Sequence, residues 1–327
     1  MIRNFFATII LLALVCAGAF VYWAQRPILG QGSQAIEFTV TPGSGVRSAA
    51  QQIAAAGVPV NPMLLALLAR VTGRSSKLKA GSYELKAGTT PLKLVGQLAR
   101  GEYAQEALVI IEGWTFKQMR DAIAVHPALK HDTVQWSDEE LLAKVDPDFR
   151  AAEGLFAPDT YLFAKGSSDL QVYRQAHALL LKRLNDGWIK RDPALPYKSP
   201  YEALIMASIV EKETGQKSER DMIAGVFVNR LRLGMLLQTD PTVIYGMGTK
   251  YQGQIRKRDL LTDTQYNTYT RTGLPPTPIA LPGVAALIAA LNPAPTDALY
   301  FVSRNDGTSE FSGNLDDHNR AVNKYQR

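Results

Sequence analysis

The longest apolar run of the chain is Asn4–Gln25, which contains no charged residue. About 20 such residues suffice for a helix to cross a bilayer, and Tyr22 and Trp23 lie where an aromatic belt would meet the membrane surface. The sequence Ala17–Ala19 is typical of a signal-peptide cleavage site. We favour an uncleaved transmembrane anchor over residues 1–26, because apolar residues continue to Trp23, with a cleaved signal peptide as the alternative.

Short strand and helix patterns alternate after a linker at residues 27–35. Apolar and polar positions alternate over Ile36–Val40 and again after Leu78, which is typical of strands. Helical periodicity, with glycines at the ends, predicts three short helices at residues 47–57, 61–72 and 91–101. The pattern therefore predicts a small α+β module over residues 36–113.

Residues 114–327 form a longer segment in which helix and strand patterns are mixed, and we expect one α/β domain there. The segment from Thr115 to about Arg191 is largely helical, with an aromatic-rich insert at Glu153–Gly166. A linker-like break at Asp192–Pro200 precedes a strongly apolar helix pattern. The fold class expected for the whole chain is α+β.

Composition excludes several classes of function. The formal net charge is +6 and the basic residues are scattered, so nucleic-acid binding gains little support, whereas an anionic polymer or a membrane surface fits. The one cysteine, Cys16, permits no disulfide within the chain. His126 and His131 have no accompanying cysteine pair, and HExxH and phosphate-loop motifs are absent from the sequence, so we expect neither a metal nor a cofactor.

Two carboxylates, Glu211 and Glu213, end the helix pattern that Pro200 opens over Tyr201–Thr214. At about 100° per residue, Glu211 shares a small, mostly apolar face with Ser208. Apolar surroundings raise the pKa of a carboxyl group, and a general acid near neutral pH requires a raised pKa. The pattern therefore makes Glu211 the first candidate for a catalytic acid.

Both glutamates also have a purely structural interpretation. Glu211 could be a buried acid that is ion-paired with Arg230 or Arg232. Glu213 shares its face with Glu202, so it could be a solvated helix residue or the partner of a nearby arginine. Helix periodicity alone does not decide between these interpretations.

Two later segments combine amide, hydroxyl and aromatic side chains, as the binding of a sugar polymer requires. They read "LLQTDPTVIYG" from Leu236 and "YNTYTRTGLPPTPI" from Tyr266. Together with an acid upstream they indicate a cleft, although each segment could equally be a polar loop held by its own hydrogen bonds. The candidates for holding a sugar or orienting the acid are Gln238, Asp240, Tyr245, Asn267 and Tyr269, with support from Ser208, Asn229 and Arg230.

These segments closely resemble the endolytic murein transglycosylase family, also called MltG or YceG-like. The resemblance extends over most of the chain and includes "EGLFAPDTY", "ASIVEKET", "SERDMIAGVFVNRL", "LNPAP" and "FSGNLDDHNRAV", in this order. One departure is Thr277, in the proline-rich loop Leu274–Gly283, where relatives often carry glycine.

The resemblance implies a single-pass enzyme of the cytoplasmic membrane with a LysM-like module at residues 36–113 and a catalytic domain at 114–327 outside the cytoplasm. It implies cleavage of peptidoglycan strands between N-acetylmuramic acid and N-acetylglucosamine without water, which leaves 1,6-anhydro ends and limits the length of nascent strands. The family's catalytic glutamate lies in the "EKE" sequence, which we assign to Glu211, with Glu213 as second choice. Glycan-polymerising synthases are implied partners.

Two alternatives from other classes stay open. A hydrolytic muramidase would use Asp240 as a second carboxylate. A non-catalytic module would bind glycan or a synthase through the LysM-like region.

Overall fold

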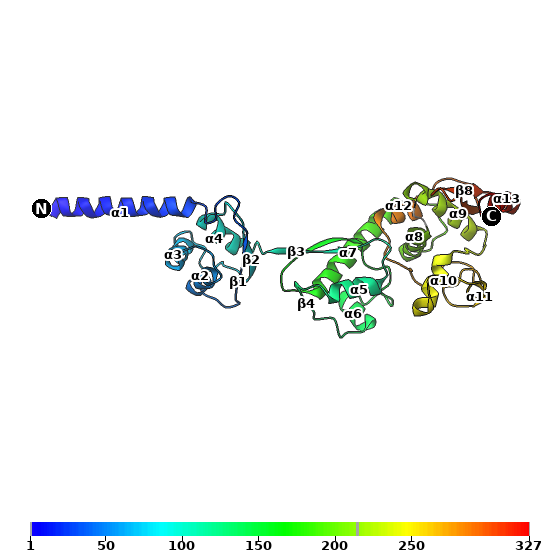
Figure 1. The fold of residues 1–327 in the computed structure, drawn as a ribbon, viewed down its shortest axis with the longest axis horizontal. Coiled ribbons are helices and arrows are strands. Elements are labelled where there is room, and N and C mark those ends of the chain that lie inside the picture. The colour runs from blue at the N-terminus through cyan, green and yellow to red at the C-terminus, as the bar shows by residue number, and fades with distance from the viewer. Residues whose placement is uncertain (1, 214–215, 327) are drawn as a thin grey trace. The chain divides into compact units, whose positions relative to one another are not determined.

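The computed structural model describes residues 2–213 and 216–326 (Figure 1). The chain divides into two compact units. The first consists of the residues up to 107 with the short pieces 128–130 and 162–167, and the second consists of the remainder. The domain limits given by the sequence remain predictions.

The first unit contains helix α1 and a small α+β module, and this mixed composition was expected from the sequence. Strands β1 (Ile36–Val40) and β2 (Gly81–Leu85) pair antiparallel, with Phe38 opposite Tyr83. Helices α2 (Val46–Ala55), α3 (Pro62–Val71) and α4 (Pro91–Arg100) pack around them. The Thr90 hydroxyl accepts a hydrogen bond from the backbone N–H of Lys93 at the start of α4, and Gly101 ends this helix in the left-handed conformation.

Helix α1 (Ile2–Gln25) contains a stretch with a mean hydropathy of 2.5 and no residue buried by the protein. Among the described residues it is the one helix long and apolar enough to cross a membrane, a criterion that a signal sequence also meets. Its last turns are different, because Phe20, Trp23 and Ala24 pack against the core of the module.

The middle of the chain combines helices with short strands. The helices are α5 (Phe116–Ala124), α6 (Asp138–Val145) and α7 (Asp169–Ile189). Strand β3 (Gln105–Ile110) pairs with β5 (Asp159–Ala164), and β4 (Leu129–Lys130) pairs with β6 (Ser167–Ser168). The aromatic-rich insert thus supplies a strand.

Helix α8 (Pro200–Glu213) is the centre of the second unit. Every residue from Ala203 to Val210 is buried, which is the pattern of a helix covered on all sides. Its neighbours are α7, α9 (Arg220–Arg232), α10 (Asp240–Met247) and α12 (Val284–Leu291). The predicted helix Tyr201–Thr214 is confirmed up to Glu213, and Thr214 lies outside the described residues.

The rest of the second unit surrounds the C-terminal end of α8. Helix α11 (Lys257–Leu261) lies in the long segment after α10. Strands β7 (Tyr300–Ser303) and β8 (Ser309–Ser312) form an antiparallel hairpin, and α13 (Leu315–Tyr325) packs against both strands.

Candidate active site

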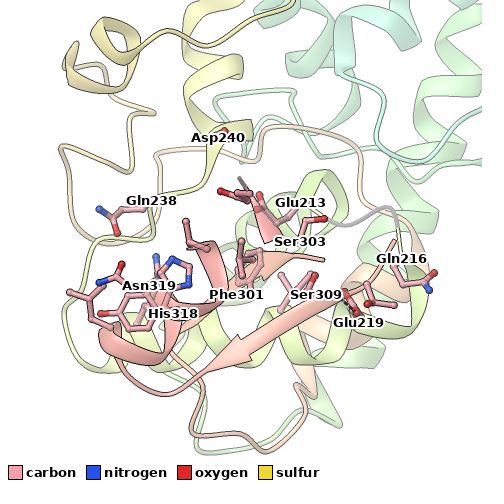
Figure 2. Close-up of a pocket in the computed structure, with 18 of the residues that line it drawn as sticks. Glu213, Gln216, Glu219, Gln238, Asp240, Phe301, Ser303, Ser309, His318 and Asn319 are labelled. Carbon is pink, nitrogen blue, oxygen red and sulfur yellow. Dashed lines mark hydrogen bonds between the residues drawn. The ribbon is translucent and has the colours of Figure 1, made fainter. Parts of the chain in front are cut away.

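A cleft of about 880 Å³ opens at the C-terminal end of α8 (Figure 2). Its lining comes from α8, the start of α10, the β7–β8 hairpin and α13. Figure 2 shows Glu213 between Asp240 and the hairpin that carries Phe301 and Ser303. The polar side chains of the lining are those of Glu213, Gln216, Glu219, Arg230, Gln238, Asp240, Tyr269, Tyr300, Ser303, Thr308, Ser309, His318, Asn319 and Gln326.

Glu213 is the carboxylic acid that α8 contributes to this cleft. Its Oε2 accepts a hydrogen bond from the Thr239 hydroxyl at 2.6 Å. Burial raises the pKa of Glu213, and the negative charge of Asp240 raises this pKa further, against the opposing effects of the Thr239 hydrogen bond and Arg230. A raised pKa favours the protonated form of a carboxyl group, which is the form that a general acid uses.

Asp240 and Tyr269 form a polar pair in the same cleft. The Tyr269 hydroxyl donates a hydrogen bond to Asp240 Oδ1 at 2.6 Å. Burial, together with this hydrogen bond, raises the pKa of Tyr269, so the hydroxyl stays protonated and available as a donor. Gln238 lies beside them with φ = 50°, a left-handed backbone that is uncommon for residues other than glycine. Such strain is found where the surrounding structure fixes a side chain at a functional site.

Arg230 holds two backbone segments next to the cleft. Its Nε donates to the carbonyl oxygen of Leu299 at 2.7 Å, and one of its terminal nitrogens donates to that of Leu237, also at 2.7 Å. The guanidinium lies 5.2 Å from the ring centre of Tyr300. Arg230 therefore joins α9 to the hairpin and to the segment before Gln238.

Glu211 has different surroundings, although it is only two residues from Glu213. Its side chain is 6% exposed and forms an ion pair with Arg220 at 3.1 Å. Its second carboxylate oxygen accepts a hydrogen bond from the backbone N–H of Gly283 at 3.0 Å. The face is therefore not apolar as expected from the sequence, and the structural alternative of a buried ion pair is realised with Arg220 instead of Arg230 or Arg232.

Three other predicted residues hold backbone segments in place. The Ser208 hydroxyl accepts a hydrogen bond from the backbone N–H of Ile279 in the proline-rich loop at 3.0 Å. The Asn229 amide donates to the carbonyl oxygens of residues 296 and 298, and the Asn267 amide to those of residues 260 and 262. Ser208 and Asn229 thus hold neighbouring backbone segments, whereas the buried Asn267 organises its own loop and does not line the cleft.

Tyr245 lies in a second cavity, of about 970 Å³, which is lined by residues of α5, α6 and α10 and by the segment 150–153. Its hydroxyl donates to Glu153 Oε2 at 3.2 Å. Glu153 also accepts a hydrogen bond from the backbone N–H of Phe116 at 2.9 Å, and burial raises its pKa to about 7. The structure therefore separates Tyr245 from the other candidates.

Sequence reasoning did not select Glu219 and His318, which also line the cleft. Glu219 accepts a hydrogen bond from the backbone N–H of Ser309 at 2.8 Å, and His318 stacks on Tyr300 with ring centres 5.1 Å apart. The motif "FSGNLDDHNRAV" contains His318, but without the fold nothing connects it with α8. Among the described residues, no group of three or more His, Cys, Asp or Glu side chains is placed to hold a metal ion.

Most of the chain is similar in sequence to known proteins of one family. The model of the YceG-like family matches residues 38–324. A protein of Bacillus subtilis (strain 168) named "Endolytic murein transglycosylase" is 31% identical over 95% of this chain and 91% of its own length. A protein with the same name from Streptococcus pneumoniae serotype 2 (strain D39 / NCTC 7466) is 27% identical over 96% of this chain, which spans 63% of that protein.

A solved structure has a similar fold. The crystal structure of the yceG-like protein lmo1499 from Listeria monocytogenes superposes with a TM-score of 0.54 at 29% sequence identity. The similarity covers 88% of this chain and 99% of that one.

Proposed function

Since the chain belongs to the YceG-like family, we infer that it is a lytic transglycosylase, an enzyme that cleaves the glycan strands of peptidoglycan endolytically. The observation that carries this inference is the alignment with two proteins named endolytic murein transglycosylase over at least 95% of the chain. The cleft at the end of α8 supports it, because it offers a carboxylic acid beside amide, hydroxyl and aromatic groups.

Of the two glutamates in the "EKE" sequence, we propose Glu213 as the catalytic acid. Glu213 lines the cleft and has a raised pKa, whereas Glu211 is ion-paired with Arg220 and capped by a backbone N–H. Both carboxylate oxygens of Glu211 are thus occupied by donors of the protein, and the side chain does not line the cleft. Glu211, the first choice from the sequence, then has the structural role of joining α8 to α9 and to Gly283.

The proposed reaction uses this one carboxyl group twice. Protonated Glu213 gives its proton to the glycosidic oxygen as the bond from C1 of N-acetylmuramic acid breaks. The resulting carboxylate takes the proton of the C6 hydroxyl of the same sugar, whose oxygen attacks C1 and closes the 1,6-anhydro ring. Each proton is returned, water is not consumed, and Asp240 raises the proton affinity of Glu213 without accepting a proton in this cycle.

The other residues of the cleft would position the sugar. The Tyr269 hydroxyl, held by Asp240, and the amide of Gln238 are placed to contact hydroxyl and acetamido groups. Tyr300, which is stacked on His318 and lies beside Arg230, would form part of the wall of the cleft. Tyr245, in the second cavity, and Asn267, buried in its loop, do not belong to this group.

Location and partners complete the proposal. Helix α1 would be a single-pass anchor in the cytoplasmic membrane, with the second unit on the extracytoplasmic side. The α+β module would be LysM-like, and glycan-polymerising synthases would be partners whose nascent strands the enzyme limits in length. The apolar helix α1 supports the anchor, and the mixed α+β composition of the module is compatible with a LysM-like fold, whereas the synthase partners follow from the family resemblance alone.

Mass spectrometry of the products tests this function. The full chain in detergent and its Glu213→Gln variant are incubated with uncrosslinked glycan strands. Anhydro ends from the parent protein and none from the variant are expected. Reducing ends would instead indicate a hydrolytic muramidase with Asp240 as second carboxylate. Absence of cleavage by a folded parent protein would favour a non-catalytic glycan-binding or synthase-binding module.

A further inference from the structure

Helix α3 carries an apolar face that points away from the core of the first unit. Met63, Leu67 and Val71 follow one another at intervals of four, and their exposed fractions are 81%, 44% and 70%. Residues four apart lie on the same face of a helix. The opposite face is buried and equally apolar, with Leu65, Ala66, Leu68 and Ala69. A surface helix ordinarily has a polar outer face, and adjoining exposed apolar side chains mark an interaction site.

The sequence segment that contains α3 has charges of one sign. From Phe38 to Tyr83 the sequence contains no Asp or Glu, and its charged residues are Arg47, Arg70, Arg74, Lys77 and Lys79. Arg70 lies in the last turn of α3, and Arg74 and Lys77 follow it directly. Apolar side chains flanked by cations are the composition of a segment that lies on an anionic lipid surface. A protein partner would not require this sign of charge.

The end of α1 is fixed to the same module without a flexible spacer. Phe20, Trp23 and Ala24 pack against its core, and the backbone N–H of Ile28 donates to the carbonyl oxygen of Thr89 at 2.8 Å. At 1.5 Å per residue, Phe20 lies about 7 Å before the end of α1 at Gln25. Interfacial helices bury their apolar face by about 5–10 Å. Contact with Phe20 therefore already brings part of the module to the depth of the lipid headgroups when α1 spans a bilayer.

We propose that α3 lies in the lipid–water interface of the membrane that α1 crosses. Met63, Leu67 and Val71 would enter the boundary of the acyl chains, and Arg70, Arg74 and Lys77 would contact anionic headgroups. Figure 1 shows α3 on the side of the first unit next to α1, and β1 and β2 on the opposite side. The proposal rests on the anchor assigned to α1 under the proposed function. It gives the module a second contact with the bilayer, which orients it relative to the membrane plane.

Depth measurements with spin labels test this arrangement in the full chain. The native Cys16 is replaced by Ser, and single cysteines are introduced at positions 63, 67 and 71 for a nitroxide label. Position 12 in α1 is the control for the bilayer interior, and the exposed Thr39 of β1 is the control for water. Each protein is reconstituted in vesicles with and without phosphatidylglycerol. The accessibility of the label to oxygen and to a water-soluble nickel complex then gives its depth.

The expected result is an interfacial depth for all three α3 positions, with position 12 deep and position 39 in water. The α3 labels should move outward in vesicles that contain only phosphatidylcholine, and equal depths in both vesicles would refute the role of the cations. Labels at 63, 67 and 71 that are as water-accessible as position 39, while position 12 is deep, would overturn the proposal and leave the anchor intact. A water-accessible position 12 would overturn the anchor and this proposal together. The assay of glycan cleavage is independent of either result.

Discussion

Replacing each glutamate of the "EKE" sequence by glutamine separates a catalytic role from a structural one. Glu213→Gln keeps an oxygen that can accept the hydrogen bond from Thr239 but removes the proton that the reaction needs. Loss of general acid–base catalysis lowers a rate by about 10²–10⁴-fold. Because the same group would act as acid and then as base, we expect a loss of at least about 10³-fold. Stability should change by about 1 kcal/mol or less, since the amide oxygen of the variant can keep the hydrogen bond from Thr239.

Glu211→Gln should have the opposite profile. The variant leaves the buried guanidinium of Arg220 without its counter-charge, and such losses cost about 3–5 kcal/mol. Taking about 3 kcal/mol, because the amide oxygen can still accept from the N–H of Gly283, the melting temperature should fall by roughly 6–12 °C at about 2–4 °C per kcal/mol. Below that temperature the variant should retain most of its activity.

Both variants are measured by thermal unfolding and by the release of anhydro-ended products, each at a temperature where circular dichroism shows a folded protein. An inactive Glu211→Gln with parental stability, together with an active Glu213→Gln, would return the catalytic role to Glu211 and refute the argument from the ion pair. Loss of activity in both folded variants would mean that the ion pair between Arg220 and Glu211 positions the carboxyl group of Glu213 in addition to stabilising the fold.

Three further predictions concern protonation. Asp240→Asn removes a charge that raises the pKa of Glu213, so the alkaline limb of the pH profile of kcat/KM should move to lower pH, because a general acid loses activity as pH rises through its pKa. Thr239→Val removes a hydrogen bond that lowers the pKa of Glu213, so the alkaline limb of the profile should move to higher pH. A shift in the same direction as for Asp240→Asn would exclude Glu213 as the titrating group. Glu153 has its pKa raised to about 7, so between its unfolded value near 4.5 and pH 7 the folded state binds more protons, and stability should fall with rising pH by roughly 3 kcal/mol. Denaturant titrations of Glu153→Gln should lack this decline, and an unchanged pH dependence would contradict the assignment.

The sequence predicted well those helices and strands whose ends are determined by neighbouring residues. The strand Ile36–Val40 has the predicted bounds, and Pro200 opens α8 as expected. The family resemblance is confirmed by the match of the YceG-like model to residues 38–324. The LysM-like character of the module and its domain limits stay predictions.

The surroundings of the two glutamates could not be derived in the same way. Helix periodicity separates the faces of Glu211 and Glu213 but does not show what lies against each face. The partner of Glu211 is Arg220, nine residues later, and its second partner is a backbone N–H at Gly283. Thr239, which binds Glu213, and His318, across the cleft, come from segments whose approach depends on tertiary packing. Long-range contacts of this kind decide which carboxylate faces the cleft.

The wall that α13 contributes to the cleft determines when the site becomes complete during synthesis of the chain. His318 and Asn319 are synthesised about a hundred residues after Glu213, and they line the same cavity. A growing chain contains its acid long before this wall exists. The cleft is therefore complete only once α13 has been synthesised and has packed against the hairpin, so a partly synthesised chain does not yet have the finished site.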